Sequence, residues 1–229
     1  MKKIEKFLNC FQKLFYYDVY HKNTYFLKKK IYRYLKKYVS VKKFPLEKIL
    51  SDLFLDLKAF YENDPAAYDF FEIIFTYQGM FAILTYRIGH ALYLLNVKYL
   101  PRMLSSYAHF RTSIDIHPAC NIDAGFFIDH GTGVVIGETT SIGKNVKIYQ
   151  GVTLGAKSLT KGHALKGQKR HPTIGNNVTI YANSSILGGD TIIGDNVIIG
   201  ANCLILESVP NNYQISLDEI KLKKKNKAG

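Results

Sequence analysis

Aliphatic side chains recur at every sixth position over most of the second half of the chain. A period of six matches neither the 3.6-residue period of an amphipathic helix nor the two-residue alternation of a half-buried strand. Repeats of six residues build parallel β-helices, with one short strand and one corner per repeat. We therefore expect a solenoid whose aliphatic residues point inward and stack between coils of roughly 18 residues. The repeated residues are Ile116, Ile122, Ile128, Val134, Ile136, Ile142, Ile148, Leu154, Ile174, Ile180, Ile186, Ile193, Ile199 and Ile205.

The residues between these aliphatic positions fit the corners of such a solenoid. Gly and Asn follow them in segments such as "IGKNVK", "IGNNVT" and "IGDNVI", and both residue types tolerate the positive φ that tight corners need. Residues 155–172, "GAKSLTKGHALKGQKRHP", lack the period, so we expect them to loop out of one coil. "ILGGDTIIG" holds one residue more than a strict repeat, which predicts a small bulge near Gly189–Asp190.

Upstream of residue 110 the apolar spacing changes to three and four, which is typical of helices. The spacing runs through "KYVSVKKFPLEKILSDLFLDLKAFYEND" and "FEIIFTYQGMFAILTYRIGHALYLLN". Between these segments, Asp64–Pro65 predicts a helix start with Asp64 as the N-cap. The α + β chain thus divides into a helical domain at 1–110, a β-helix at 111–210 with its loop at 155–172, and a basic tail at 211–229.

The formal charge of +13 belongs to the ends of the chain. Residues 1–43 carry 13 Lys and Arg against two acids, and residues 218–229 carry five lysines against two acids, so residues 44–217 sum to −1. Charge confined to the ends is typical of solvated helix faces and tails, so we expect neither nucleic acid nor membrane as a partner.

The remaining composition indicates a cytoplasmic protein. The basic N-terminus lacks the continuous apolar core of a signal peptide, and the most apolar segment, "AILTYRIGHALYLL", is interrupted by Arg87 and His90. These two residues are expected in core or interface roles. The scattered cysteines Cys10, Cys120 and Cys203 predict neither a disulfide framework nor a metal site.

Several segments of the chain closely resemble the serine O-acetyltransferase family, with a match that runs from about residue 60 to 210. They are "DPAAYDFF", "YRIGHALYL", "SIDIHPACNIDAGFFIDHGTGVVIGETTSIGKNVKIYQGVTLGAK" and "KRHPTIGNNVTIYANSSILGG". The resemblance implies a left-handed β-helix, acetyl-CoA as the acetyl donor and L-serine as the acceptor, in the first step of cysteine biosynthesis. It also implies a homo-oligomer, a trimer or a dimer of trimers.

Acetyl transfer to serine needs a base, because the serine hydroxyl is a very weak acid. Histidine, whose ordinary pKa is about 6.5, commonly fills this role when a carboxylate orients it. His130 in "IDHGTG" is the predicted base, and its predicted partner is Asp115, 15 residues earlier and thus on the preceding coil. The family's catalytic dyad falls on the same pair. The plain alternative is that Asp129–His130 forms a polar corner.

Free serine carries two charges that its site must match. By alignment with the family, Asp129 and Asp64 flank the ammonium group, although Asp64 also fits its role as a helix cap. Arg170 suits the carboxylate because guanidinium offers a bidentate fork. His171 matches a substrate-site histidine that would also steady the oxyanion. The alternative reading of Arg170–His171 is a basic loop end, and His117 is read as structural.

The resemblance places the pantetheine arm of the donor in a groove between neighbouring β-helices, where small residues allow backbone contact. By alignment these residues are Gly155, Ala156, Ala182, Gly200 and Ala201. Loop lysines that could meet the CoA phosphates are Lys157, Lys161, Lys166 and Lys169. No metal is expected.

Three rival functions share this fold. A sugar or other small-hydroxyl O-acetyltransferase would lack the charged set that serine demands. A γ-type carbonic anhydrase needs two histidines spaced HxxxxH, and none of the seven histidines is so spaced. A non-catalytic scaffold would have no use for the pairing of Asp115 with His130.

Two further expectations concern regulation and partners. L-cysteine carries the same ammonium and carboxylate as serine, so it is expected to bind the same residues as a feedback inhibitor. In many family members a C-terminal isoleucine enters the active site of O-acetylserine sulfhydrylase. The tail here is "SLDEIKLKKKNKAG", with only Ile220 as an internal anchor, so a stable complex through Gly229 is not expected.

Overall fold

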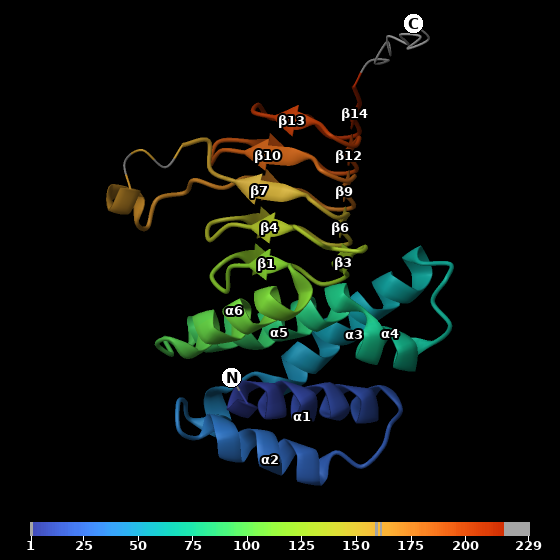
Figure 1. Cartoon of the computed structure of the whole chain (residues 1–229), viewed down its shortest axis with the longest axis vertical. Coiled ribbons are helices and arrows are strands. Elements are labelled where there is room, and N and C mark those ends of the chain that lie inside the picture. The colour runs from blue at the N-terminus through green and yellow to red at the C-terminus, as the bar shows by residue number, and fades with distance from the viewer. Residues whose placement is uncertain (1, 159, 161, 218–229) are drawn as a thin grey trace, which may run out of the picture.

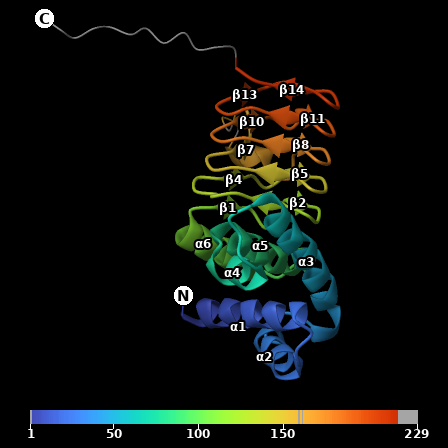
Figure 2. The same cartoon turned by 90° about the vertical axis from the view of Figure 1, so that its right-hand side faces the viewer.

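The computed structural model describes residues 2–158, 160 and 162–217. A layer of helices forms one end of the molecule, and a triangular stack of short strands forms the other (Figure 1). The same two parts are separate in the view turned by 90° (Figure 2). The helical domain and left-handed β-helix predicted from the sequence are both confirmed.

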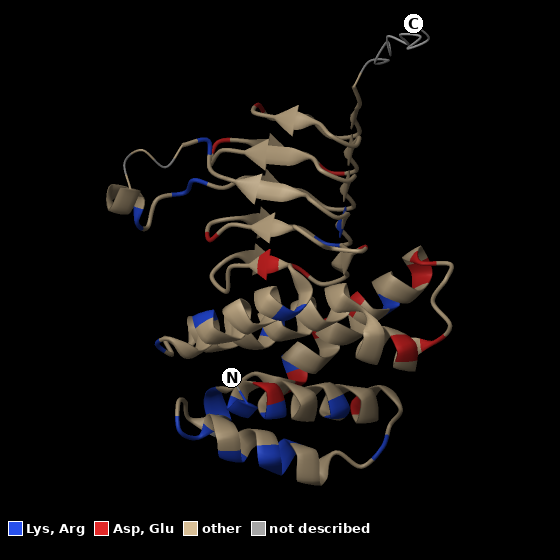
Figure 3. Cartoon of the chain, in the orientation of Figure 1, with Lys and Arg blue, Asp and Glu red and all other residues tan. Residues whose placement is uncertain are grey.

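In the described part of the chain, six α-helices build the N-terminal part. Their bounds are α1 Lys2–Val19, α2 Tyr25–Leu35, α3 Leu46–Asn63, α4 Phe70–Thr76, α5 Gln78–Leu94 and α6 Leu100–Thr112, with a 3₁₀ turn, η1, at Val41–Lys43. α5 is buried nearly all round, whereas α1 and α2 bury one face each. Lys and Arg gather on these two outermost helices (Figure 3). Among the described helices, none combines the length and apolar character needed to cross a bilayer.

Among residues 2–158, 160 and 162–217, fourteen short parallel strands form three faces. Sheet A contains β1 Asp115–Ile116, β4 Val135–Ile136, β7 Thr153–Gly155, β10 Ser185–Leu187 and β13 Leu204–Ile205. Sheet B contains β2 Asn121–Ile122, β5 Ser141–Ile142, β8 Thr173–Ile174 and β11 Ile192–Ile193. Sheet C contains β3 Phe127–Ile128, β6 Lys147–Ile148, β9 Thr179–Ile180, β12 Ile198–Ile199 and β14 Gln214–Ile215. We name the three edges of the prism corner AB, corner BC and corner CA after the sheets they join.

The repeated aliphatic residues form ladders inside the prism, as predicted. In sheet A, Ile116 pairs with Ile136, Ile136 with Leu154, and Leu154 with Ile186. Each of these side chains is at most 5% exposed. The ladder is possible because side chains at matching positions of successive coils point the same way. The last coil extends past residue 210, since β14 pairs with β12.

Corner BC carries a ladder of asparagines. The backbone φ is between 55° and 64° at Asn145, Asn177, Asn196 and Asn212. Each side-chain amide donates to the next, with N–O distances of 3.2, 3.1 and 2.9 Å along the series. Asn fits because it tolerates the left-handed region and its amide can both donate and accept.

The two predicted irregularities are present. The segment after β7 leaves the prism, forms a short 3₁₀ turn, η2, at Gly162–Leu165, and returns at β8 (Figure 1). The extra residue near Gly189–Asp190 lies in a turn that begins at Gly188, where φ is 111°. Ile193 still pairs with Ile174, so the strand register survives the insertion.

One predicted helix start is wrong. Asp64 is the C-cap that follows α3, and its Oδ1 accepts the Ala66 N–H at 2.8 Å in a local turn. The next helix begins at Phe70, and Asp69 is its N-cap, accepting the Glu72 N–H at 2.8 Å. An aspartate before proline can bond two residues ahead as readily as it caps a helix, and here the turn prevails.

A buried ion pair joins the helices to the β-helix. Arg87 on α5 donates two hydrogen bonds of 2.9 Å to Asp56 on α3, and the two side chains are 7% and 0% exposed. Asp56 also accepts the N–H groups of Gly125 and Phe126 at 2.9 Å each, while Arg87 donates to the Asp123 carbonyl at 2.8 Å. These contacts confirm the predicted core role of Arg87.

Candidate active site

Asp129 and His130 lie at corner CA, directly after β3. His130 adopts a left-handed backbone with φ of 55°, and its side chain is 71% exposed. Its Nε2 lies 3.7 Å from Oδ1 of Asp129. The exposed imidazole and the neighbouring carboxylate thus face the surface together and are available to a ligand.

The helical domain adds two polar residues beside this corner. Asp64 Oδ2 accepts a hydrogen bond of 2.7 Å from the Tyr77 hydroxyl. Burial raises the pKa of Tyr77, and the charges of Asp64 and Asp129 raise it further, so the phenol stays protonated as a donor. Both predicted ammonium-binding carboxylates therefore act on the same phenol.

A glycine brings α5 against β3 at this point. A Cβ on Gly79 would lie 2.4 Å from the Ile128 carbonyl oxygen, so only glycine permits the observed approach. Tyr77 precedes this contact on the helical side and Asp129 follows it on the β-helix side. The close packing of Gly79 therefore sets the distance between the two groups.

Among the described residues, no hydrogen bond and no ion pair within 4 Å joins Asp115 to His130, the pair that the sequence predicts. Asp115 begins β1, half-buried, and its backbone pairs with Val135 of the next coil. The carboxylate found within 4 Å of the His130 ring belongs to Asp129. The left-handed turn at His130 directs its exposed side chain toward its own neighbour, a feature that spacing along the chain does not reveal.

Arg170 and His171 lie at corner AB, where the loop rejoins the prism. Arg170 forms an ion pair with Glu138, which holds the pKa of that carboxyl below its usual range. His171 is 8% exposed, and its ring packs over Gly137, where a Cβ would lie 2.1 Å from ring atom Cδ2. Burial, helped by Arg170, lowers the pKa of His171 to about 4. This histidine is therefore neutral at pH 7, and the Arg170 guanidinium is paired with the Glu138 carboxylate.

Thr139 joins this group without having been predicted. Its hydroxyl oxygen accepts the N–H groups of Arg170 at 3.0 Å and His171 at 3.1 Å. It also lies 2.9 Å from Nδ1 of His171. Thr139 and Glu138 belong to the "GET" segment that follows β4, so that motif was the available signal. Tyr77 had no comparable signal in the sequence.

The predicted donor-binding residues divide between the same two corners. Gly155 and Ala156 lie at corner AB, and Ala156 lines a cavity of about 250 Å³ together with Arg170 and Gly188. The residues at corner CA lie on two successive coils, where Asn202 N–H donates to the Ala182 carbonyl at 2.9 Å. These are Ala182, Gly200 and Ala201.

The lysines of the loop differ in their surroundings. Lys169 donates to the Thr139 carbonyl at 2.6 Å and the Pro172 carbonyl at 3.2 Å, so it serves the loop rather than a free anion site. Lys157 lines the same cavity as Ala156, whereas Lys166 is exposed. Lys161 and the tail anchor candidates Ile220 and Gly229 lie outside the described residues.

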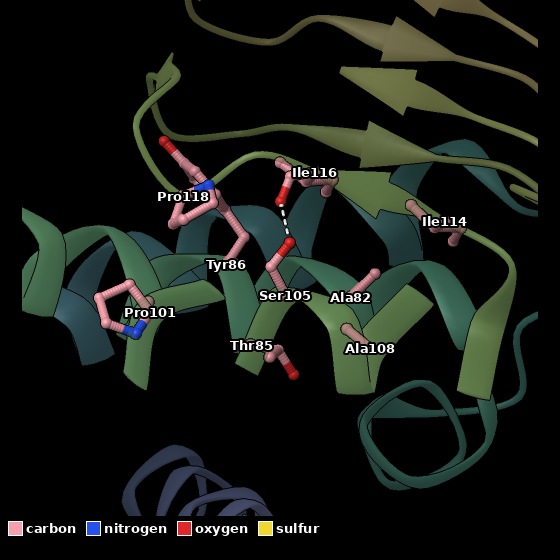
Figure 4. Close-up of a pocket in the computed structure, with 10 residues that line it drawn as sticks. Ala82, Thr85, Tyr86, Pro101, Ser105, Ala108, Ile114, Ile116 and Pro118 are labelled. Atoms are coloured by element: carbon pink, nitrogen blue, oxygen red, sulfur yellow. Dashed lines mark hydrogen bonds between the residues drawn. The ribbon is translucent and has the colours of Figure 1, made fainter. Parts of the chain in front are cut away.

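His117 and His90 occupy structural positions. His117 is half-buried, its Nδ1 accepts the Ala119 N–H at 3.1 Å, and burial lowers its pKa. His90 on α5 contacts the Pro118 carbonyl at 2.9 Å. A seam between α5, α6 and β1 encloses a cavity of about 10 Å³, bordered by Ser105, whose hydroxyl donates to Ile116 (Figure 4). That volume holds one water molecule at most, so the seam is packing and not a ligand site.

The candidate site is therefore split across sheet A. His130, Asp129 and Asp64 gather at corner CA, whereas Arg170 and His171 gather at corner AB. The chain crosses sheet A between the corners over residues 134–137, roughly 10–15 Å at ~3.3 Å per residue. That backbone span is longer than a free amino acid.

The known proteins that are similar to the chain are described as hexapeptide-repeat transferases and serine acetyltransferases. A family model described as bacterial transferase hexapeptide (six repeats) matches residues 171–207. A serine acetyltransferase of Synechococcus elongatus is 52% identical over 132 residues, covering 56% of this chain and 41% of that protein. The chain spans about half the length of the first curated relatives it matches, 41–55%.

Solved structures show the same similarity over more of the chain. Serine acetyltransferase 1 of Entamoeba histolytica, in complex with L-cysteine, has a TM-score of 0.80 and 38% identity, covering 92% of this chain and 86% of that one. A serine acetyltransferase in complex with CoA has a TM-score of 0.66 and 34% identity, covering 74% and 68%.

Proposed function

The chain belongs to the serine acetyltransferase family, and from this premise we propose that it transfers an acetyl group from acetyl-CoA to L-serine. The products are O-acetyl-L-serine and CoA. The observation that carries the proposal is the cluster of the exposed His130 with the carboxylates of Asp129 and Asp64, which suits a base beside an ammonium group. The solved relatives with L-cysteine and with CoA support the same two classes of ligand.

His130 is the general base of the proposed reaction. Its neutral imidazole removes the proton from the serine hydroxyl as the oxygen attacks the thioester carbonyl carbon. The tetrahedral intermediate then collapses, the carbon–sulfur bond breaks, and the CoA sulfur leaves with the proton returned by the imidazolium. Its 71% exposure leaves the ring accessible to the acceptor hydroxyl.

Asp115 is proposed to orient His130 when the site is loaded. Asp129 is then free to contact the substrate ammonium together with Asp64, whose orientation Tyr77 supports through its 2.7 Å hydrogen bond. When the Asp129 carboxylate moves from the His130 imidazole to the positively charged substrate ammonium, it gains a charge-assisted hydrogen bond. A second carboxylate then takes over the stabilisation of the imidazolium.

We place the serine carboxylate at Arg170 and His171 of a neighbouring protomer. The split of the site across sheet A supports a trimer, in which corner CA of one prism faces corner AB of the next. The donor residues are split in the same way, so the pantetheine arm would lie in the same groove. L-cysteine, with serine's ammonium and carboxylate, would compete for this site as a feedback inhibitor.

The test of this function is CoA release from acetyl-CoA. The wild-type chain should release CoA with L-serine and not with sugars or without an acceptor. His130→Ala should lose about 10²–10⁴ in turnover, the usual contribution of a general base, while CoA affinity stays unchanged. His109→Ala, a change at an exposed helical histidine, is the control and should retain full turnover.

Two outcomes would contradict the proposal. Release of CoA with sugars at a higher kcat/KM than with L-serine would assign the chain to another acceptor class. Wild-type turnover in His130→Ala would remove His130 from the reaction.

A further inference from the structure

Thr139 makes an unusually complete set of contacts with the predicted substrate histidine. Its hydroxyl oxygen accepts the backbone N–H groups of Arg170 and His171, at 3.0 and 3.1 Å. The same oxygen lies 2.9 Å from Nδ1 of His171, and the Thr139 N–H lies 3.1 Å from that nitrogen.

The number of available protons decides the direction of these bonds. A hydroxyl has one proton and two lone pairs, and both lone pairs of Thr139 already accept backbone N–H groups. Its proton must therefore point at Nδ1 of His171. The Thr139 N–H, which can only donate, points at the same nitrogen. Nδ1 is therefore an acceptor and carries no proton.

The other ring nitrogen then carries the single proton of the neutral imidazole. The pKa of His171 is lowered to about 4, mainly by burial, with Arg170, Lys169 and His117 acting in the same direction and Glu138 opposing them. The ring is neutral at pH 7, and a neutral ring with a bare Nδ1 is protonated at Nε2.

This Nε2–H group has no hydrogen-bond partner among the described residues. The fully buried side-chain atoms of these residues that lack a partner are Thr140 Oγ1 and Gln150 Oε1. Nε2 therefore keeps solvent access. Gly137 lies against the same edge of the ring and leaves it uncovered by a side chain.

We propose that Thr139 is a positioning residue that holds His171 in the Nε2–H tautomer, as a fixed hydrogen-bond donor to an anionic oxygen of the substrate. The inference rests on the proposed acetyl transfer, in which that oxygen belongs to the serine carboxylate or to the tetrahedral intermediate. A histidine held in this way donates a hydrogen bond from its Nε2–H group, and its Nδ1 is already occupied as an acceptor, so it cannot serve as the base. The two histidines thus have distinct roles.

The tautomer can be measured directly by nitrogen NMR. In the full-length chain labelled with ¹⁵N-histidine, the His171 ring should show a protonated Nε2 and a bare Nδ1 at pH 7, with its signals assigned by their loss in His171→Gln. Thr139→Val keeps the β-branched shape and removes the hydroxyl, so it should mix the tautomers. Thr139→Ser should restore the wild-type pattern.

Thr140→Val is the matched control. The neighbouring threonine is 1% exposed, and its hydroxyl has no partner among the described residues, so its loss should leave the His171 spectrum unchanged. In the serine assay, Thr139→Val should lose about ten- to a hundredfold in kcat/KM, as expected for a misplaced reactive group. Thr139→Ser and Thr140→Val should stay near wild type.

The NMR measurement and the serine assay distinguish a failure of this inference from a failure of the proposed function. A wild-type His171 protonated at Nδ1, or a Thr139→Val variant that keeps the single tautomer, would overturn the role of Thr139 whatever the activity. A wild-type chain that shows the Nε2–H tautomer but acetylates no serine would support the positioning role and reject serine as the acceptor.

Discussion

Single residues of the candidate site differ most in their burial. His130 is 71% exposed at its side chain, whereas His171 is 8% exposed and lies over Gly137. The His130 ring lies open to solvent, whereas burial beside Arg170 keeps the His171 imidazole neutral. Base and hydrogen-bond donor can therefore coexist at the same pH because their surroundings differ.

The buried histidine predicts a dependence of stability on pH. Folded His171 has a pKa of about 4 against about 6.5 when unfolded, so between these values the unfolded chain binds more protons. The free energy of unfolding should fall as pH falls from 6.5 to 4. In His171→Gln that slope should be shallower by up to ~1.4 kcal/mol per pH unit. Urea unfolding at several pH values measures it, and identical slopes in both proteins would refute the assignment.

Sequence patterns identified the charged residues of the site but not all of their partners. His130 and Arg170 each lie in a short sequence motif that can be recognised without knowledge of the fold. Thr139 touches His171 only because the loop after β7 re-enters on the coil next to β4, and that return point depends on three-dimensional stacking. Likewise, the left-handed turn that brings His130 to Asp129 is a backbone property of the corner.

Among elements, α3 and α5 are joined to the β-helix by Asp56 and Arg87. The six-residue repeat predicted the coils well because every coil places aliphatic side chains in the same inward-facing ladders. The helix boundary near Asp64 was less predictable, since Asp64 and Asp69 both fit a cap and only the competing local turn decides between them. Interfaces between unlike elements carry no period, so Asp56 had no signal in the sequence.

The ion pair between these helices gives a prediction at the element scale. Arg87→Met should reduce the free energy of unfolding by about 3–5 kcal/mol, because it leaves the fully buried Asp56 carboxylate without its charge partner. Lys48→Met is the control, since it breaks the exposed pair with Asp52 and should cost under about 1 kcal/mol. Equal losses in the two variants, measured by chemical denaturation, would contradict a buried charge pair.

The whole molecule presents its proposed site as two halves on opposite edges of one sheet. In the proposed reaction, each chain offers a base at corner CA and a carboxylate-binding pair at corner AB. In a closed trimer every corner CA meets the corner AB of a neighbour, so three complete sites arise from three incomplete chains. Assembly is thus part of the proposed chemistry.

Mixed trimers test this arrangement. His130→Ala and Arg170→Ala should each be inactive alone. Co-expressed in equal amounts, they should recover about a quarter of wild-type turnover, because one contact in four joins two intact corners in a random closed ring. Co-expressing His130→Ala with Asp129→Asn, both at corner CA, is the control and should recover nothing. Absence of recovery in the first mixture, with trimers confirmed by light scattering, would place the whole site within one chain.

The asparagine ladder at corner BC has a mechanical consequence. Each amide bonds only to the coil above and the coil below, as do the strands, so neighbouring coils are held by repeated local contacts of similar strength. A pulling force applied at the C-terminal end would meet these contacts one coil at a time instead of all together. The prism should lengthen in steps, each of which releases roughly 18 residues of chain. One step should be longer, because the coil that contains the loop between β7 and β8 has more residues.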